Sequence, residues 1–266
     1  MFDRFNRRIN YLRISVTDRC NLKCRYCMPE GNVRFFKPGE ILSFEEIREA
    51  IKVAVSLGID KIRLTGGEPL VRKDIVDLVR MIASVEGIKD LSLTTNGLLL
   101  NGFALPLADA GLTRINVSLD TLDPIKFSAL TRGGNLDLVL AGIEAAKSAG
   151  LNPIKVNCVI KSNHLEPDAV AVKNFCNHNG LVARFIKQMD LQNGHFERVE
   201  GGSGGDCASC NRLRLTSNGM IKPCLFSNSE FNIRHLGVRQ AIEMALAIKP
   251  AKGAKNLNNC FHNIGG

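Results

Sequence analysis

The sequence predicts a parallel α/β fold. Strand-like and helix-like segments alternate through six repeats between residues 11 and 189, which is the pattern of a sheet whose strands are joined by crossover helices. Five of these strands pair an apolar face with a polar and often basic face. The 266 residues suffice for one barrel-sized domain, or for a barrel with a small appendage. An open doubly wound sheet and a barrel both fit this alternation.

The expected elements follow from apolar periodicity and from capping and turn residues. Ser43, with Glu46 three residues later, predicts the start of the first long helix, and Gly58 predicts its end. The expected strands cover residues 11–16, 60–65, 90–95, 114–119, 154–160 and 182–189. The expected helices cover residues 44–57, 73–84, 103–110, 124–130, 136–149 and 168–177.

Strand parity gathers polar side chains on one face of the expected sheet. This set comprises Tyr11, Arg13, Ser15, Lys61, Arg63, Thr65, Ser92, Thr94, Asn96, Asn116, Ser118, Asp120, Lys155 and Asn157. A strand buried on both faces would instead be a continuous apolar run. Exposure of the polar faces on an antiparallel sheet is the alternative, but it conflicts with the intervening helices. We therefore expect these side chains to line a wet lumen that holds a ligand.

The net charge of +9 has two interpretations, a nucleic-acid surface or a pocket for an anionic small molecule. No run of five basic residues occurs and the chain has no Trp, which favours the pocket. The apolar runs are too short to span a bilayer, and the charged N-terminus is not a signal core. The nine cysteines therefore indicate a reducing cytoplasm, where clustered cysteines bind metal more often than they form disulfides.

The first cysteine set lies near the N-terminus and consists of Cys20, Cys24 and Cys27. Three thiolates within eight residues leave one over in any disulfide pairing, but they are soft ligands suited to iron–sulfur clusters and zinc. A closed zinc site needs four ligands, so this local set leaves one metal position open. An iron–sulfur cluster that holds a small molecule at the open iron is the favoured interpretation. A zinc site completed by a distant Cys or His is the alternative.

The second cysteine set consists of Cys207, Cys210 and Cys224. Asn218-Gly219 predicts a two-residue hairpin between the last two of them, which would place Cys224 opposite Leu213 and close to Cys210.

Arg212 and Arg214 would then share one strand face beside these thiols. The alternative is a zinc knuckle whose fourth ligand is Cys260, His235 or His262. Cys158 and Cys176 are expected in the core.

The stretch Arg13-Ile-Ser-Val-Thr-Asp-Arg-Cys20, the first cysteine set and Met28-Pro29 resemble the radical S-adenosylmethionine (SAM) superfamily, and more narrowly the GTP 3′,8-cyclase family of molybdenum cofactor biosynthesis. The resemblance implies an incomplete (βα)6 TIM-type barrel over residues 1–190. It also implies a small C-terminal auxiliary-cluster region over residues 191–266, which ends in a Gly-Gly tail.

The resemblance further implies two 4Fe-4S clusters and SAM as cofactors and GTP as substrate, one cluster on each cysteine set. A 5′-deoxyadenosyl radical from SAM would abstract the ribose C3′ hydrogen, and the product would be 3′,8-cyclo-7,8-dihydro-GTP. The positions that match SAM-binding residues are Tyr26, Gly66, Gly67, Glu68, Thr94, Ser118 and Met189; Glu68 belongs to Gly66-Gly67-Glu68-Pro69, which matches the GGEP motif. Those that match GTP-binding residues are Arg13, Lys61, Arg63, Lys155, Arg184, Arg212 and Arg214, of which Arg13, Arg212 and Arg214 are also expected to assist catalysis.

The family also implies partners: a flavodoxin or ferredoxin as electron donor, cyclic pyranopterin monophosphate synthase downstream, and a second copy in a homodimer, with no membrane or nucleic acid. The chain departs from the family between Met189 and Cys207, where 17 residues replace several dozen and Gly201-Gly-Ser-Gly-Gly205 is typical of a flexible linker. Of the properties that the resemblance implies, this shortening affects the cyclase activity more than the two clusters. Cys260 is either a tail residue or a fourth ligand that would close the second cluster.

Two other functions remain open. One is a radical SAM enzyme with an auxiliary cluster that acts on a peptide or a sugar nucleotide. The other is a zinc-binding module that recognises nucleic acid.

Overall fold

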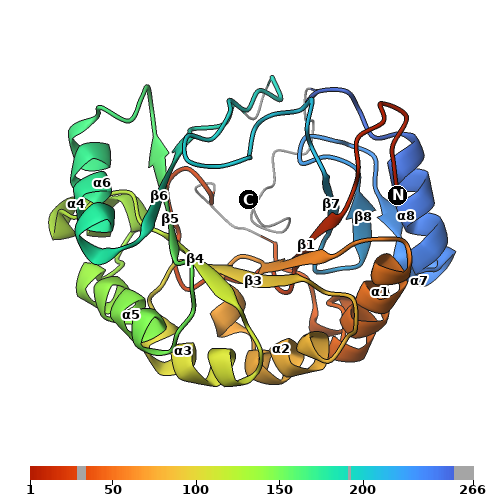
Figure 1. The fold of residues 1–266 in the computed structure, drawn as a ribbon, viewed down its shortest axis with the longest axis horizontal. Helices are drawn as coiled ribbons and strands as arrows, with labels where there is room; N and C mark the ends of the chain where they lie inside the picture. The colour runs from red at the N-terminus through yellow and green to blue at the C-terminus, as the bar shows by residue number, and fades with distance from the viewer. Residues whose placement is uncertain (29–33, 191–192, 255–266) are drawn as a thin grey trace.

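A single curved sheet runs through the computed structural model, which describes residues 1–28, 34–190 and 193–254. Its strand order is β6-β5-β4-β3-β2-β1-β7-β8-β9, and β1 to β7 pair in parallel (Figure 1). The strands are β1 (Tyr11–Ser15), β2 (Lys61–Thr65), β3 (Asp90–Thr95), β4 (Arg114–Ser118), β5 (Lys155–Ile160), β6 (Val182–Lys187), β7 (Arg212–Leu215), β8 (Met220–Lys222) and β9 (Phe231–Asn232). The sheet thus continues through β7 into the C-terminal part of the chain.

Helices cover the outer, convex side of this sheet and leave the inner side open (Figure 1). They are α1 (Phe44–Ser56), α2 (Ile75–Ala83), α3 (Leu100–Asp109), α4 (Pro124–Thr131), α5 (Leu136–Ser148), α6 (Pro167–Asn179), α7 (Ile233–Leu236) and α8 (Val238–Ala247), with short 3-10 turns at Pro38–Glu40 and Pro69–Val71. The expected incomplete barrel is therefore confirmed. Within the described ranges, no helix is long and apolar enough to cross a membrane.

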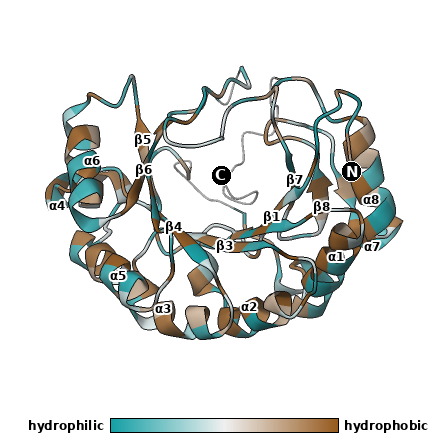
Figure 2. Cartoon of the chain, viewed as in Figure 1, coloured by the Kyte–Doolittle hydropathy of each residue, from teal (hydrophilic) through white to brown (hydrophobic). Residues whose placement is uncertain are grey.

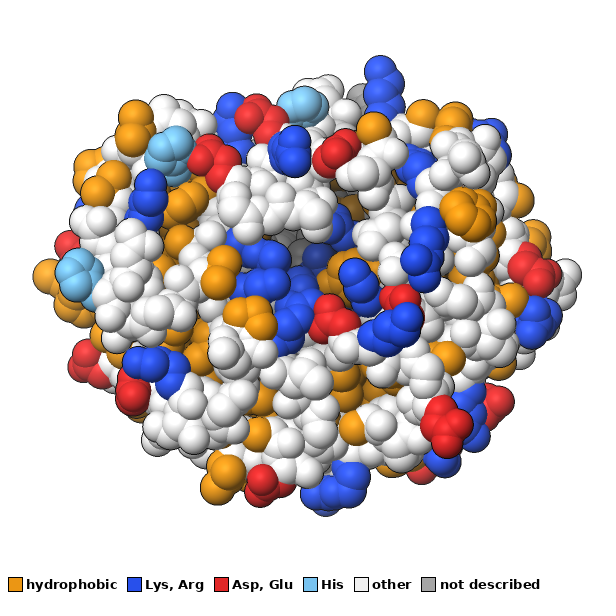
Figure 3. Space-filling view, in the orientation of Figure 1, with side chains coloured by type: hydrophobic (Ala, Val, Ile, Leu, Met, Phe, Trp, Pro, Cys, Tyr) orange, Lys and Arg blue, Asp and Glu red, His pale blue; other side chains and the backbone are white. Residues whose placement is uncertain are grey.

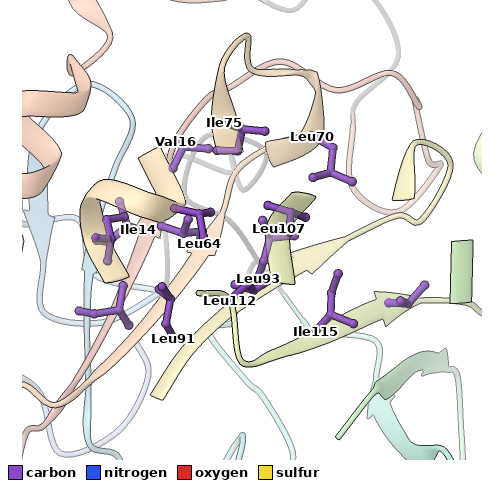
Figure 4. Close-up of a cluster of buried hydrophobic side chains, with 14 of the residues drawn as sticks. Ile14, Val16, Leu64, Leu70, Ile75, Leu91, Leu93, Leu107, Leu112 and Ile115 are labelled. Atoms are coloured by element: carbon purple, nitrogen blue, oxygen red, sulfur yellow. The ribbon is translucent and has the colours of Figure 1, made fainter. Parts of the chain in front are cut away.

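The core lies between the convex face of the sheet and its helices (Figure 4). Ile14, Leu64, Leu93 and Ile115, one from each of four neighbouring strands, are completely buried there. Each buried side chain of this size stabilises the fold by about 1.5–3 kcal/mol relative to its exposed state. The helices present hydrophobic residues to the sheet and hydrophilic residues outward (Figure 2). The predicted strand parity is therefore confirmed on the apolar side.

The start of α1 agrees with the predicted capping box. Ser43 Oγ accepts a hydrogen bond from the backbone N–H of Glu46 at 3.1 Å, and Glu46 Oε2 accepts one from the backbone N–H of Ser43 at 2.7 Å. The same carboxylate pairs with Arg234 of α7 at 2.6 Å, so one glutamate both caps the helix and ties it to the C-terminal part of the chain.

The register of the hairpin between β7 and β8 differs by one residue from the predicted register. Arg214 pairs with Lys222 and Leu215 with Ile221, so the register aligns position 224 with Arg212 and not with Leu213. The loop has three residues, because Thr216 accepts a backbone bond from Gly219 and donates one to Met220. Gly219 has a φ of +87°, as the last position of such a loop requires. An Asn-Gly pair fits this loop as well as the shorter one, so the sequence alone favoured the wrong register.

The residues after β6 cross the open side of the arc toward β7. Phe185 of β6 exchanges two backbone hydrogen bonds with Glu200, both 3.1 Å, and Arg212 of β7 donates to the Ser203 carbonyl at 3.1 Å. A Cβ added at Gly201 would come within 2.5 Å of the Ala183 carbonyl oxygen. The glycine run interpreted as a flexible linker is therefore folded onto β6. Pro29, Cys260, His262 and Gly265-Gly266, which the sequence analysis singled out, lie outside the described residues.

The contact between α3 and α5 generates a stability prediction. A Cβ at Gly142 of α5 would lie 2.7 Å from the Gly97 carbonyl oxygen and 2.9 Å from Leu100 Cβ, whereas a Cβ at Gly102 of α3 would meet nothing within 4 Å. We expect Gly142→Ala to lower the free energy of unfolding by about 1–3 kcal/mol through overpacking. The matched control Gly102→Ala should raise it by about 0.5 kcal/mol, since Ala is the better helix former. Urea unfolding followed by circular dichroism measures both; equal effects would contradict the close contact.

Candidate active site

A cavity of about 620 Å³ opens on the inner side of the sheet, and basic side chains gather in it (Figure 3). Every residue that the sequence analysis assigned to SAM or GTP contributes to its wall. These are Arg13, Tyr26, Lys61, Arg63, Gly66, Gly67, Glu68, Thr94, Ser118, Lys155, Arg184, Met189, Arg212 and Arg214. The cavity also reaches the segment that crosses from β6 to β7, through Phe196, Val199, Ser203 and Gly204.

Positive charge dominates this wall, which carries eight Lys and Arg side chains but two acidic ones, Asp90 and Glu68. Asp90 accepts two hydrogen bonds from Arg114, at 2.8 and 2.5 Å, so its charge is already matched. Glu68 accepts from Thr95 Oγ1 at 2.7 Å and from the backbone N–H groups of Asn96 and Leu70 at 2.6 and 3.0 Å. Neither carboxylate remains to balance the other cations, so the cavity suits a polyanionic ligand.

The crowding of these cations appears in their pKa values. Burial, together with the charge of Arg184, Arg114 and Arg63, lowers the pKa of Lys155 to about 8. Burial and the neighbouring Arg212 lower the pKa of Arg214 to about 10. The pKa of Arg13 is well below its usual value, first through burial and then through Arg214. A bound anion would relieve this repulsion.

Tyr11 is a cavity residue that the sequence analysis placed on the polar face without assigning it a role. The guanidinium groups of Arg63 and Arg212 lie over its ring, 5.5 and 5.6 Å from the centroid, in cation–π geometry. Its hydroxyl is buried without a hydrogen-bond partner among the residues that the structure describes, and so is Thr94 Oγ1. Unsatisfied buried hydroxyls in a cavity wall are consistent with a ligand that supplies the missing bonds.

The three cysteines of the first set all line the cavity. Burial raises the pKa of Cys20 to about 11 and that of Cys24 to about 12, and mutual repulsion with Cys27 adds to both shifts. The Leu22 N–H donates to Cys20 Sγ at 3.3 Å. Three soft donors that repel one another as thiolates need a cationic group between them, which fits a metal cluster.

Neither cysteine set forms a ready site for a single metal ion within the described ranges. No three Cys, His, Asp or Glu side chains there gather closely enough to hold one ion, and this includes any zinc site completed by His235. Ligands of one zinc ion all lie about 2.3 Å from it, whereas those of an iron–sulfur cluster bind different irons of a larger body.

Gly66 and Gly67 have a structural role that the sequence analysis did not foresee. A Cβ on Gly66 would lie 2.8 Å from the Thr17 carbonyl oxygen, and one on Gly67 would overlap the Arg19 carbonyl group. The N–H groups of Gly67 and Glu68 donate to Thr17 and Arg19, both at 2.8 Å. These glycines therefore allow the end of β2 to hold the chain that leads into Cys20.

Tyr26 is fixed by a hydrogen bond from its hydroxyl to Asp120 Oδ2 at 2.7 Å. The other oxygen of Asp120 accepts the backbone N–H of Val159 at 2.8 Å. The loop of the first cysteine set is thus tied to the ends of β4 and β5. Strand parity predicted that Asp120 lies on the inner face, but no sequence pattern predicted its hydrogen bond with Tyr26.

The cysteines of the second set are not among the described residues that line the cavity, whereas Arg212 and Arg214, which follow Cys210 on β7, are. Burial lowers the pKa of both Arg214 and Lys249, and the charges of Cys210 and Cys224 oppose this decrease. Although burial acts to raise it, the pKa of Cys210 is lowered by Lys249 and Arg212. Arg7, paired with Asp3 at 2.6 Å, donates to the Cys207 carbonyl at 2.7 Å.

The leading influences on the two sets therefore differ, since Lys249 and Arg212 act to lower the pKa of Cys210 whereas burial raises that of Cys20 and Cys24. Lys249 and Arg7 were both missed from sequence, because neither lies in a motif. Cys158 and Cys176 are buried in the core as expected.

Comparison with known proteins agrees with this geometry. Residues 14–175 match the Radical SAM superfamily and residues 177–256 match Molybdenum Cofactor Synthesis C. The GTP 3′,8-cyclase of Peptoclostridium acidaminophilum is 42% identical over 88% of this chain and 85% of its own length. That of Thermodesulfovibrio yellowstonii is 40% identical over 94% of each, in an alignment of 304 positions, which is longer than this chain. The relatives thus have residues without a counterpart here.

Solved structures share the fold at low sequence identity. Streptococcus suis SuiB bound to S-adenosylmethionine has a TM-score of 0.67 at 18% identity, covering 86% of this chain and 64% of that one. Native anSMEcpe with bound AdoMet has a TM-score of 0.64 at 16% identity, covering 91% and 81%. The alternative of a zinc-binding nucleic-acid module is therefore wrong. With its two cysteine sets, its basic cavity and relatives at about 40% identity over most of its length, the chain belongs to the GTP 3′,8-cyclase family of the radical SAM superfamily.

Proposed function

We propose that this protein converts GTP to 3′,8-cyclo-7,8-dihydro-GTP, the first step of molybdenum cofactor biosynthesis. The names of its relatives support the reaction, and the cavity supports the substrate. One observation carries the proposal: among the described residues, eight Lys and Arg side chains but two carboxylates line a cavity whose wall also carries the first cysteine set. A peptide substrate would not need this excess of positive charge.

Cys20, Cys24 and Cys27 would hold a 4Fe-4S cluster, with SAM at its open iron. When bound, these two groups supply the one-electron chemistry that removes the ribose C3′ hydrogen of GTP. Among the protein's own groups, Tyr26 is held by Asp120 at the cavity wall, where it could pack against the adenine of SAM. Thr94 offers a free hydroxyl, and Ser118, Met189, Gly66, Gly67 and Glu68 complete the wall that we assign to SAM.

The substrate site uses the cations of the opposite part of the cavity. Lys61, Arg63, Lys155 and Arg184 come from the three strands β2, β5 and β6 and would bind the triphosphate, each charge-assisted contact contributing about 1.5–3 kcal/mol. Arg13, Arg212 and Arg214 come from the adjacent β1 and β7, where Arg13 and Arg214 pair across the ladder. These three would orient the guanine and stabilise charge during cyclisation.

Cys207, Cys210 and Cys224 would hold the second 4Fe-4S cluster, behind Arg212 and Arg214. Cations around these thiols support this assignment, because they favour the deprotonated form that binds iron. We assign radical formation to residues 1–190 and substrate anchoring to residues 191–266, although the sheet itself is continuous across that boundary.

The surrounding pathway follows from the reaction. A flavodoxin or ferredoxin would supply electrons to the first cluster, and cyclic pyranopterin monophosphate synthase would consume the product. We place the enzyme in the cytoplasm as a homodimer.

Anaerobic incubation with dithionite, SAM and GTP tests the reaction. We expect 5′-deoxyadenosine and a cyclised guanine nucleotide, both dependent on GTP and both measured by liquid chromatography with mass spectrometry. Release of 5′-deoxyadenosine without any cyclised nucleotide would show that GTP is not the substrate. Two zinc ions and no acid-labile sulfide in the purified protein would end the radical interpretation altogether.

Variants of the two arginines beside the second cysteine set sharpen this test. Arg212→Ala or Arg214→Ala should reduce the cyclised product by about 10- to 100-fold, the loss of one charge-assisted contact, and leave SAM cleavage in place. Arg80→Ala is the control, since Arg80 is exposed on α2 and pairs with Asp77. Equal loss of SAM cleavage and cyclisation in R212A would contradict a role confined to the substrate.

The lowered pKa of Lys155 predicts how GTP binding depends on pH. Below about pH 8 Lys155 is charged in both the free and the bound enzyme, so the affinity is constant with respect to this group. Above it the free enzyme loses the proton that a bound phosphate would retain, so the affinity should fall. Titration calorimetry with GTP at pH 7 and pH 9 measures this. Lys155→Arg should remove most of the decrease; an identical decrease in K155R would exclude Lys155 as its source.

A further inference from the structure

Lys249, which follows α8, is one of the largest completely buried side chains, with 1% of its surface exposed. No acidic side chain pairs with it in the part of the chain that the structure describes. An ammonium group in this setting is expensive unless hydrogen bonds and an opposite charge compensate it. Its surroundings therefore have to supply a negative charge.

The contacts of Lys249 all belong to the second cysteine set and its flanking backbone. Its Nζ donates to the Arg212 carbonyl at 2.7 Å and to the Pro223 carbonyl at 2.6 Å. These two bonds join β7 to the chain that follows β8, beside Cys210 and Cys224. Arg212 follows Cys210 by two residues and Pro223 directly precedes Cys224, so the ammonium group lies against the backbone that carries both thiols.

The negative charge that faces Lys249 is that of the thiolates. Burial lowers the pKa of Lys249, the charges of Cys210 and Cys224 oppose that shift, and Lys249 in turn acts to lower the pKa of Cys210. Among the described residues, no cation is a leading influence on Cys20 or Cys24, where burial and repulsion among the thiols raise the pKa. A hydrogen bond to a ligating sulfur and a nearby positive charge are two of the properties that set the reduction potential of an iron–sulfur cluster.

We propose that Lys249 is the internal counter-cation of the second cysteine set, and that it positions Cys210 and raises the reduction potential of the cluster bound there. This inference rests on the proposed second cluster. Lys249 does not line the cavity, so it acts through the cysteines and is a positioning residue, not a catalytic one. Reduction adds an electron to the cluster, and a fixed positive charge beside the sulfur favours that step.

A purely structural role would predict something different. The two carbonyl contacts could simply hold the hairpin, in which case loss of Lys249 would lower stability and leave the potential of any remaining cluster unchanged. Lys222 offers a matched control on the neighbouring strand. It is also buried, at 2% exposure, but it pairs with the carboxylate of Glu230 at 3.3 Å. Lys222→Met therefore removes a buried lysine whose charge is already balanced.

The test is an anaerobic redox titration followed by electron paramagnetic resonance, on the holoenzyme and on the Lys249→Met, Lys249→Arg and Lys222→Met variants. At the wild-type midpoint of the second cluster, K249M should show at least a tenfold lower ratio of reduced to oxidised cluster, which is about 59 mV for one electron. The first cluster should keep its midpoint. K249R, which retains the charge, and K222M should both stay within a factor of three of the wild type.

Each outcome decides a separate point. A K249M ratio within a factor of three of the wild type overturns the counter-cation, and so does a K249R shift as large as that of K249M. If K249M cannot retain the second cluster, iron and sulfide analysis decides: retention in K249R supports the inference, and loss in K249R overturns it. A wild-type protein with the signal of one cluster only would instead refute the proposed second cluster itself.

Discussion

Mutual repulsion among the cations of the cavity is the constraint on which the rest of the structure depends. Eight basic side chains share one wall, and burial together with their mutual repulsion lowers the pKa values of Lys155, Arg184 and Arg214. The opposite faces of the same strands are buried beneath helices, and this apolar burial offsets the unfavourable free energy of gathering the cations. The period of two along each strand is what separates the two faces, so a single pattern produces both the core and the site.

Residues near both ends of the described chain hold the backbone of the second cysteine set. Arg7, paired with Asp3, donates to the carbonyls of Cys207 and Pro250, while Lys249 donates to the carbonyls of Arg212 and Pro223. The first cysteine set is instead held from the side, by Gly66 and Gly67 against the residues that precede it. Burial and mutual repulsion raise the pKa of the Cys20 and Cys24 thiols, whereas Lys249 and Arg212 act to lower that of Cys210. The two cysteine sets therefore differ in electrostatic environment.

The sequence predicted the parallel order, the inward parity and the cavity residues assigned to SAM and GTP, because each depends on local periodicity or on a motif. Strand ends agreed to within about two residues. The hairpin register was missed by one, since Asn-Gly suits both loop lengths. Lys249, Arg7 and the bond between Tyr26 and Asp120 could not be predicted. They join positions far apart in the chain, and a lone lysine or arginine carries no periodic signal.

The affinity of the loaded enzyme for GTP and for guanosine, measured by anaerobic titration calorimetry, tests the central claim most directly. If the inward cations hold the triphosphate, GTP should bind at least about 100-fold more tightly than guanosine, or about 2.7 kcal/mol, and the difference should shrink with added salt. Equal affinities at low salt would contradict the account, because the cations of the cavity would then have no part in holding the substrate.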